Sequence, residues 1–491
     1  MKNKYYGITF CLAMIVLSAN LQAQEIMRLS PAQAVDLAIK NNLGLESSRA
    51  NLAARKRASD LSWNQFIPNV SVAGILNRDN QPNTLTGLAH VPWDDRFALM
   101  GLNQGQFELS VPTIGTFYNY VMPYSIELPQ WRVAGNIQAS LNISIAMFEN
   151  IKRLRLDYET GLLSYDKAKR QLERDVRKAY HNMLLLQENI ALLHSSFANL
   201  ERQVQMAQAN YNAGLAPELV LLQVRVAREN MRPIIDQAEN GMKLSMAQFA
   251  MFLGLDFNTQ FELIPIAGNV IQGDFIPIDV TEMIKQAASK KPDIQELRST
   301  IMMLQSARKM SIYSLAPVLN LSWNNTSAFI KDPWKDNWFS SADDWRHSGS
   351  FSITFALRLH SLIPFSTDFQ GIRNLDDQIK TATIGLAQLV YGTEIEVYNS
   401  VLALERTRIN TEALSQTVGL AQQSYRLTEQ AYQAGLQDYF QVQNAEQSLR
   451  QARVQLLEQQ FNYLNGLIDL EYSIGVPFGT LSNMAVNSRE N

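Results

Sequence analysis

Residues 428–436 read TEQAYQAGL, and residues 207–215 read AQANYNAGL. Each stretch ends a long helical pattern with Tyr-x-Ala-Gly-Leu, and the offset of 221 residues between the copies continues without a gap to Gly254 and Gly475. Glycine adopts the left-handed conformation that closes the last turn of a helix, and Pro217 suits the first turn of a new one. We therefore predict that both stretches are tips of helical hairpins, near residues 211–217 and 432–438.

Apolar residues lead into the first tip at strict spacings of four and three, which is the heptad seam of a coiled coil. The seam consists of Leu172, Val176, Ala179, Met183, Leu186, Ile190, Leu193, Phe197, Leu200, Val204, Ala207 and Tyr211. The same register recurs 221 residues later with a more polar set, from Thr393 to Tyr432. A duplication of this length predicts two tandem structural repeats.

The beginnings of the two halves also correspond, at an offset of 249 residues that relates Pro68 to Pro317. Each half is expected to open with one helix of 37 residues, 30–66 and 279–315, which a proline stops before an alternating segment. The expected organisation is repeat 1 at 24–255, a linker at 256–278, repeat 2 at 279–476 and a tail at 477–491.

Residues 1–23 are expected to be a signal peptide. Lys2 and Lys4 precede an apolar run at 8–17, and Ala23 offers a small residue for cleavage before Gln24. The only cysteine, Cys11, lies inside that run, so the mature chain would have no disulfide and no thiolate metal site. The sequence thus predicts an exported protein.

Composition excludes little by itself. The net charge is −3 and no apolar stretch of 18 residues follows the leader, so nothing indicates a nucleic-acid partner or a membrane-spanning helix. An exported chain can still enter a membrane as β-strands, which give only a weak hydropathy signal.

Four alternating segments are expected to be strands, near 69–77, 136–147, 318–325 and 349–360. Their lengths suit tilted strands that cross a membrane, but a soluble sheet with one wet face alternates in the same way. Export and the long helices favour the membrane. The insert at 78–135 and the tryptophan-rich loop around Trp334 lie between the strands. The tryptophans suit a membrane interface, and the alternative is a polar loop anchored on its own aromatic rings.

This order of parts, with its two constant offsets and the Tyr-x-Ala-Gly-Leu tips, resembles the TolC-type outer membrane efflux proteins over nearly all of residues 29–476. The resemblance implies an α+β membrane protein with two tandem helix-strand-strand-helix-helix repeats. As a trimer it would form a 12-stranded outer-membrane β-barrel continued by a long periplasmic α-helical coiled-coil barrel. Four strands cannot close a barrel in lipid, whereas twelve leave room for a lumen.

The implied function is a trimeric channel-tunnel in the outer membrane, extending into the periplasm. It would be the passive exit duct of a tripartite efflux or type I secretion system. The chain would assemble as a homotrimer in contact with outer-membrane lipid. Its other implied partners are a periplasmic adaptor and, through the adaptor, an inner-membrane transporter.

The resemblance carries one binding site over by position. In the family the adaptor docks on the hairpin tips. In this chain the tips carry Tyr211, Gly214 and Leu215, and then Tyr432, Gly435 and Leu436.

A periplasmic, iris-like gate is also implied, which relatives close with a tyrosine, an arginine and aspartates. Tyr432 matches the tyrosine. Where relatives have the arginine, this chain has Gln437, and where they have the two aspartates it has Gln441 and Asn444. The acidic residue that relatives place in the first half corresponds to Val220. The resemblance thus implies a gate that has lost its charges but keeps amides.

Two other classes of function remain open. A periplasm-spanning scaffold without a permeant substrate would use the same helices, although polar strand faces favour a wet lumen. An enzyme would need a hydrolytic site in the insert 78–135, which has His90 but no recognisable nucleophile arrangement. No cofactor or metal site is expected, because the five histidines are scattered and no catalytic motif occurs.

Overall fold

The structure is a computed structural model that describes residues 27–81, 84–90, 121–127, 130–265, 279–330 and 345–481. The expected signal peptide, the loop around Trp334, most of the expected linker and most of the tail lie outside these residues. The described elements fall into two compact units, divided near residues 60, 151, 308 and 372. We refer to them as the helical unit and the strand unit.

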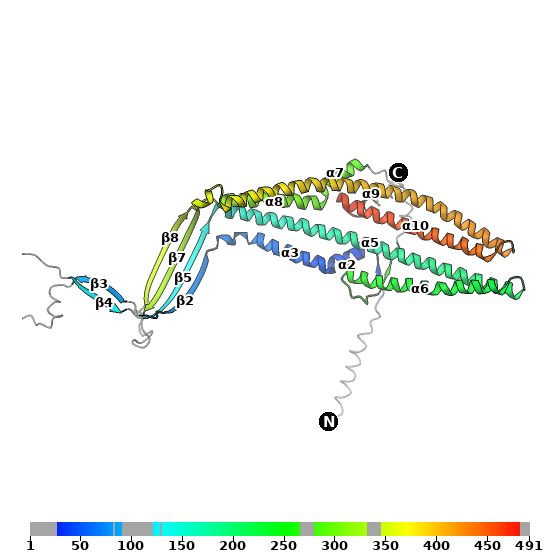
Figure 1. Cartoon of the computed structure of the whole chain (residues 1–491), viewed down its shortest axis with the longest axis horizontal. Coiled ribbons are helices and arrows are strands. Elements are labelled where there is room, and N and C mark those ends of the chain that lie inside the picture. The colour runs from blue at the N-terminus through cyan, green and yellow to red at the C-terminus, as the bar shows by residue number, and fades with distance from the viewer. Residues whose placement is uncertain are drawn as a thin grey trace, which may run out of the picture. The chain divides into compact units, whose positions relative to one another are not determined.

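The helical unit contains two long helical hairpins (Figure 1). In the first, α5 (Ile145–Asn212) is followed by α6 (Glu218–Phe252), and in the second, α9 (Thr367–Gln433) is followed by α10 (Tyr439–Ile474). With 68 residues at 1.5 Å each, α5 is about 100 Å long. Among the described residues no helix is both long enough and apolar enough to cross a membrane.

Each half opens with two helices rather than the single helix that the sequence suggested. They are α2 (Pro31–Asn41) and α3 (Leu43–Asp60), and then α7 (Val280–Lys290) and α8 (Pro292–Tyr313). The first break is at Asn42, whose backbone is extended. Its Oδ1 accepts from the N–H groups of Gly44 and Leu45 at 2.9 and 3.1 Å, and its Nδ2 donates to the carbonyl of Phe252 at 3.0 Å. The asparagine therefore caps the second helix and ties it to the end of α6.

Tyr180 organises the core of the first half. This fully buried side chain of α5 packs edge-on against Phe249 of α6 at 6.4 Å. Its hydroxyl lies 2.8 Å from the carbonyl oxygen of Leu29 and 2.7 Å from that of Ile264. These carbonyls flank a short parallel pair of strands, β1 (Met27–Leu29) and β6 (Phe261–Leu263), which local alternation does not reveal.

The strand unit contains an antiparallel sheet in the order β2-β5-β7-β8. The strands are β2 (Asn69–Arg78), β5 (Trp131–Ile143), β7 (Val318–Ile330) and β8 (Trp345–Ala356). A separate hairpin pairs β3 (Thr84–His90) with β4 (Val121–Glu127), so the insert 78–135 contains strands that the sequence did not suggest. Short 3-10 helices, η1 (Ser62–Phe66) and η4 (Leu359–Leu362), complete the unit.

Two strands differ in position from the expectation, and a third, β7, starts where expected but continues to Ile330, beyond the expected end at 325. The strand placed at 136–147 ends at Ile143, because α5 begins at Ile145. It begins earlier, at Trp131, which pairs with Arg78. The strand placed at 349–360 runs instead from Trp345 to Ala356, opposite β7. In both cases the partner strands, rather than the alternation of the segment itself, determine where the strand ends.

Candidate functional site

The two hairpin tips have the same backbone geometry. Gly214 and Gly435 both have φ 72°. The leucine after each glycine donates its N–H to the carbonyl oxygen five residues earlier: Leu215 to Asn210 and Leu436 to Ala431, each at 2.8 Å. This hydrogen-bond pattern closes a helix and requires the glycine. It leaves Leu215 and Leu436 79% and 78% exposed at the ends of the hairpins.

Tyr432 and Val220, two of the expected gate residues, meet in one apolar cluster that joins the hairpins. This tip cluster consists of buried Ala207, Leu221, Val224 and Tyr439 with partly buried Val204, Val220 and Tyr432. The rings of Tyr432 and Tyr439 lie 6.2 Å apart, edge to face. Burial raises the pKa of both phenols.

The other three expected gate residues are not part of this cluster. Gln437, Gln441 and Asn444 are exposed. Gln441 and Asn444 are three residues apart on one face of the first turns of α10, opposite the buried face, and Gln437 directly precedes the N-cap of that helix. Asp438 next to them is the N-cap of α10, and its Oδ1 accepts from the N–H of Gln441 at 3.0 Å. The three amide side chains are thus uncharged and exposed in the described chain.

A buried polar layer lies near the tip cluster, and sequence reasoning missed it. It consists of Gln203 of α5, Tyr425 of α9 and Glu446 of α10, of which Gln203 and Glu446 are 2% and 8% exposed. Gln203 Nε2 donates to the Tyr425 hydroxyl at 3.5 Å, which in turn contacts Glu429 Oε1 at 3.3 Å. The sequence contains one indication of this layer. Tyr439, Val442, Glu446 and Leu449 follow the spacing of a buried helix face, so Glu446 occupies a position where an apolar residue is expected.

The sheet has two chemically different faces. Because opposite residues of antiparallel strands point to the same side, the register groups Leu319, Leu321 and Trp323 with Phe355, Ile353 and Phe351. These side chains are partly or largely exposed, Phe355 to 72%. Together they form an exposed apolar surface along β7 and β8, of the kind that marks a contact with lipid or protein.

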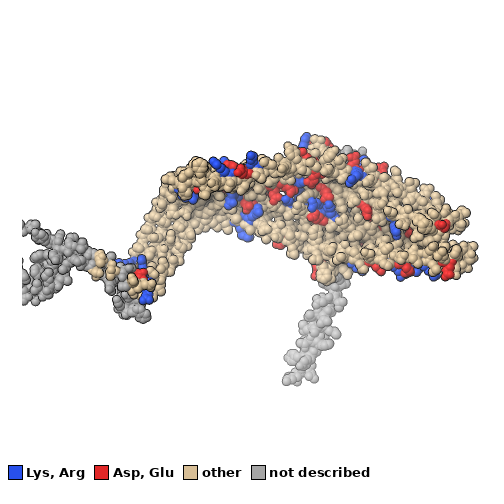
Figure 2. Space-filling model, viewed as in Figure 1, with Lys and Arg blue, Asp and Glu red and all other residues tan. Residues whose placement is uncertain are grey.

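The opposite face of the sheet is lined by amides and hydroxyls that bond across strands. Asn320 Nδ2 donates to Asn142 Oδ1 at 2.6 Å, and Thr326 Oγ1 donates to Asn136 Oδ1 at 3.2 Å. The hydroxyls of Ser322 and Ser352 are 2.7 Å apart. On the face that Figure 2 shows, the sheet carries few charged side chains, and these gather mainly at the end where β2 stops and β5 begins.

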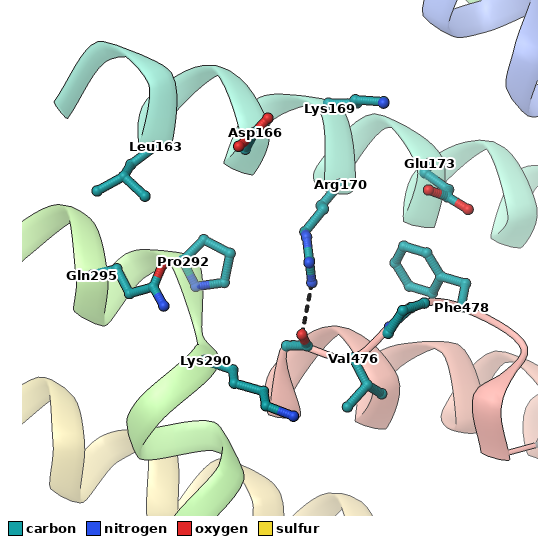
Figure 3. A pocket seen from close by; sticks show the side chains of 12 residues that line it. Leu163, Asp166, Lys169, Arg170, Glu173, Lys290, Pro292, Gln295, Val476 and Phe478 are labelled. Atoms are coloured by element: carbon teal, nitrogen blue, oxygen red, sulfur yellow. Dashed lines mark hydrogen bonds between the residues drawn. The ribbon is translucent and has the colours of Figure 1, made fainter. Parts of the chain in front are cut away.

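The helical unit also has a hollow of about 550 Å³ between α5, the start of α8 and the chain after α10 (Figure 3). Arg170 donates to the carbonyl of Gly475 there at 2.9 Å, and Lys290 extends toward Val476. Carboxylates of Asp166 and Glu173 share its lining. The hollow includes none of the expected site residues. Within the described part of the chain no three His, Cys, Asp or Glu residues are grouped so as to hold a metal ion.

Comparisons with known proteins agree with this geometry. Residues 34–255 match the family described as outer membrane efflux protein. The fold is similar to that of a membrane protein from Pseudomonas aeruginosa, with a TM-score of 0.67 and 15% identity over 91% of this chain and 93% of that one. It is also similar to the outer membrane protein VceC of Vibrio cholerae, with a TM-score of 0.66 and 13% identity over 91% and 96% of the two chains.

The outer membrane channel CmeC of Campylobacter jejuni gives a TM-score of 0.65 and 12% identity, over 94% of this chain and 89% of that one. At such identities the likeness establishes the fold. No curated protein matches the sequence.

Proposed function

Since residues 34–255 belong to the outer membrane efflux protein family, and the chain has the fold of the TolC-type channels, we propose that it is the passive exit duct of an efflux or secretion system. Three copies would form a channel in the outer membrane that continues through the periplasm. Solutes would pass without chemical change.

The division of the sheet into two faces is the observation that carries this proposal. An exposed face of Leu321, Trp323, Ile353 and Phe355 suits lipid. A hydrogen-bonded, nearly uncharged face of asparagine and serine suits a water-filled lumen. A scaffold would not require a polar face of this kind on a membrane-inserted sheet.

The edges of the sheet argue for assembly. In the described chain β2 and β8 are the edge strands of a four-stranded sheet. Unpaired backbone groups are not tolerated in lipid, so each edge needs a partner. Pairing of β8 with β2 of a second copy, repeated three times, gives twelve strands and a barrel wide enough for an open lumen.

The hairpin tips are the proposed contact with a periplasmic adaptor. Leu215 and Leu436 stand exposed at equivalent places on equivalent turns, and Phe440 is exposed one turn farther along. Exposed apolar side chains of this kind mark protein–protein contacts. The adaptor would link the duct to an inner-membrane transporter, which supplies the energy.

The experiment that tests the proposed function is a measurement of single-channel conductance in planar bilayers, with the oligomeric mass determined on the same detergent-extracted preparation. We expect a trimer and discrete conductance steps. A monomer or dimer that gives no steps at any voltage, in the parent and in Tyr432→Phe alike, would favour the scaffold. The variant serves as a control for a parent channel whose gate is tightly shut.

A further inference from the structure

The polar layer near the hairpin tips contains two buried acceptors that lack a donor. Oε1 of Gln203 and Oε1 of Glu446 are both buried and have no hydrogen-bond partner among the described residues. A buried acceptor without a donor destabilises the packed state, and a buried charge does so more strongly. The layer joins α5 of the first hairpin to α9 and α10 of the second, so this destabilisation affects the contact between hairpins.

The groups that face Glu446 come from every neighbouring helix. On α10 they are Tyr439 and Arg450, and on α9 they are Tyr425 and Glu429. Arg450 also reaches α6, where its Nη1 lies 3.9 Å from Met231 Sδ. Arg450 is half-buried, and among the described residues no ion pair joins it to Glu446.

Burial is the main cause that raises the pKa of the Glu446 carboxyl, and Glu429 acts in the same direction. Arg450 and the Gln203 side chain lower it by less. Burial also raises the pKa of Tyr425, to about 12, so the tyrosines of the layer remain neutral hydroxyls at physiological pH. Glu446 is therefore the group of this layer that changes charge.

We propose that Glu446 is a proton-linked latch between the two hairpins. When Glu446 is protonated, its carboxyl O–H supplies the layer with a hydrogen-bond donor, which the Gln203 Oε1 acceptor lacks. Protonation also removes the buried negative charge. In the ionised state both acceptors stay unsatisfied and the carboxylate is buried, so the second hairpin is held less tightly to the first. That this loosening opens a channel rests on the proposed function.

The direction of the pH effect follows from the raised pKa. A carboxyl whose pKa is higher in the packed state than in the open state binds its proton more tightly when packed. The contact is thus strongest below the pKa of the carboxyl in the open state, and it weakens as the pH rises through the pKa of the packed carboxyl. The closed tip should be favoured in acid and the open tip at neutral and alkaline pH.

The test compares the parent with Glu446→Gln, which carries a neutral amide able to donate, and with Glu458→Gln, a control at an exposed position of the same helix. Open probability is recorded in planar bilayers across a pH series. We expect the parent and the control to open several-fold more at neutral than at acidic pH, and Glu446→Gln to stay mostly closed at every pH. Equal pH profiles for the parent and Glu446→Gln would overturn the latch.

Hydrogen exchange provides a second readout that does not need a pore. At a single neutral pH, amides around 203–210 and 439–446 should exchange more slowly in Glu446→Gln than in the parent, because the tip contact is tighter. Unchanged or faster exchange in the variant would contradict the latch. Absence of conductance in all three proteins would instead count against the proposed channel, and the exchange result would still decide the latch.

Discussion

Two glycines with the same backbone conformation have different surroundings. Gly435 and Gly475 have φ of 72° and 73°. A Cβ on Gly435 would meet nothing within 4 Å, whereas one on Gly475 would lie 2.8 Å from the carbonyl carbon and oxygen of Lys290. Gly435 is thus required by the turn alone, but Gly475 also lets α10 approach the break between α7 and α8.

Alanine at these positions should separate the two effects. Gly435→Ala should cost about 1–2 kcal/mol, the strain of a left-handed alanine. Gly475→Ala should lower the melting temperature clearly further, because backbone atoms of Lys290 cannot move aside cheaply. Thermal melts of the solubilised protein, followed by circular dichroism of the helices, measure both. An equal fall in melting temperature for the two variants would show that the close approach of Gly475 to Lys290 contributes nothing to stability.

Asn444 tests the neutral gate at the same scale. If the face of α10 with Gln441 and Asn444 lines the tunnel mouth, Asn444→Asp adds a carboxylate to each copy, and converging carboxylates attract cations. We expect the reversal potential in a salt gradient to shift toward greater cation preference. Gln443→Asp adds the same charge at an exposed position off that face and should shift it less. An identical response from both variants would place the gate elsewhere.

At the scale of the element, the sheet is defined by its register. Neighbouring residues of β8 point to opposite faces: Ile353 pairs with Leu321 on the apolar side, and Ser352 pairs with Ser322 on the polar side. Because the period of a strand is two, a shift of one residue would exchange these environments.

A lysine at each of these two positions should therefore have opposite consequences. Ile353→Lys places a charge on the lipid face, which costs roughly 2–4 kcal/mol near the midplane, so the amount of assembled membrane protein should fall. Ser352→Lys should assemble normally and move the ion preference toward anions. Membrane fractionation followed by conductance measures both. Loss of assembly with Ser352→Lys but not with Ile353→Lys would reverse the assignment of the faces.

At the scale of the whole molecule, the duplication is visible in tertiary contacts as well as in sequence. Gly254 ends α6 against the backbone of Asn41, and Gly475 ends α10 against Lys290. Asn41 and Lys290 are themselves 249 positions apart, the offset that relates the beginnings of the two halves. The match of residues 34–255 agrees with the family expected from the sequence, and the expected fold is confirmed by similar solved structures at 12–15% identity.

The sequence by itself determined the features that depend on local patterns. Heptad spacing determined the long helices, Ala-Gly-Leu determined their ends, and alternation located four strands, because each pattern needs only neighbouring residues along the chain. The tertiary structure alone decided what depends on distant partners. Strand ends follow the paired strands, Asn42 breaks a helix where it reaches Phe252, and Glu446 is buried only because Gln203 and Tyr425 arrive from other helices. Burial and register are properties of contacts between segments, which local periodicity does not contain.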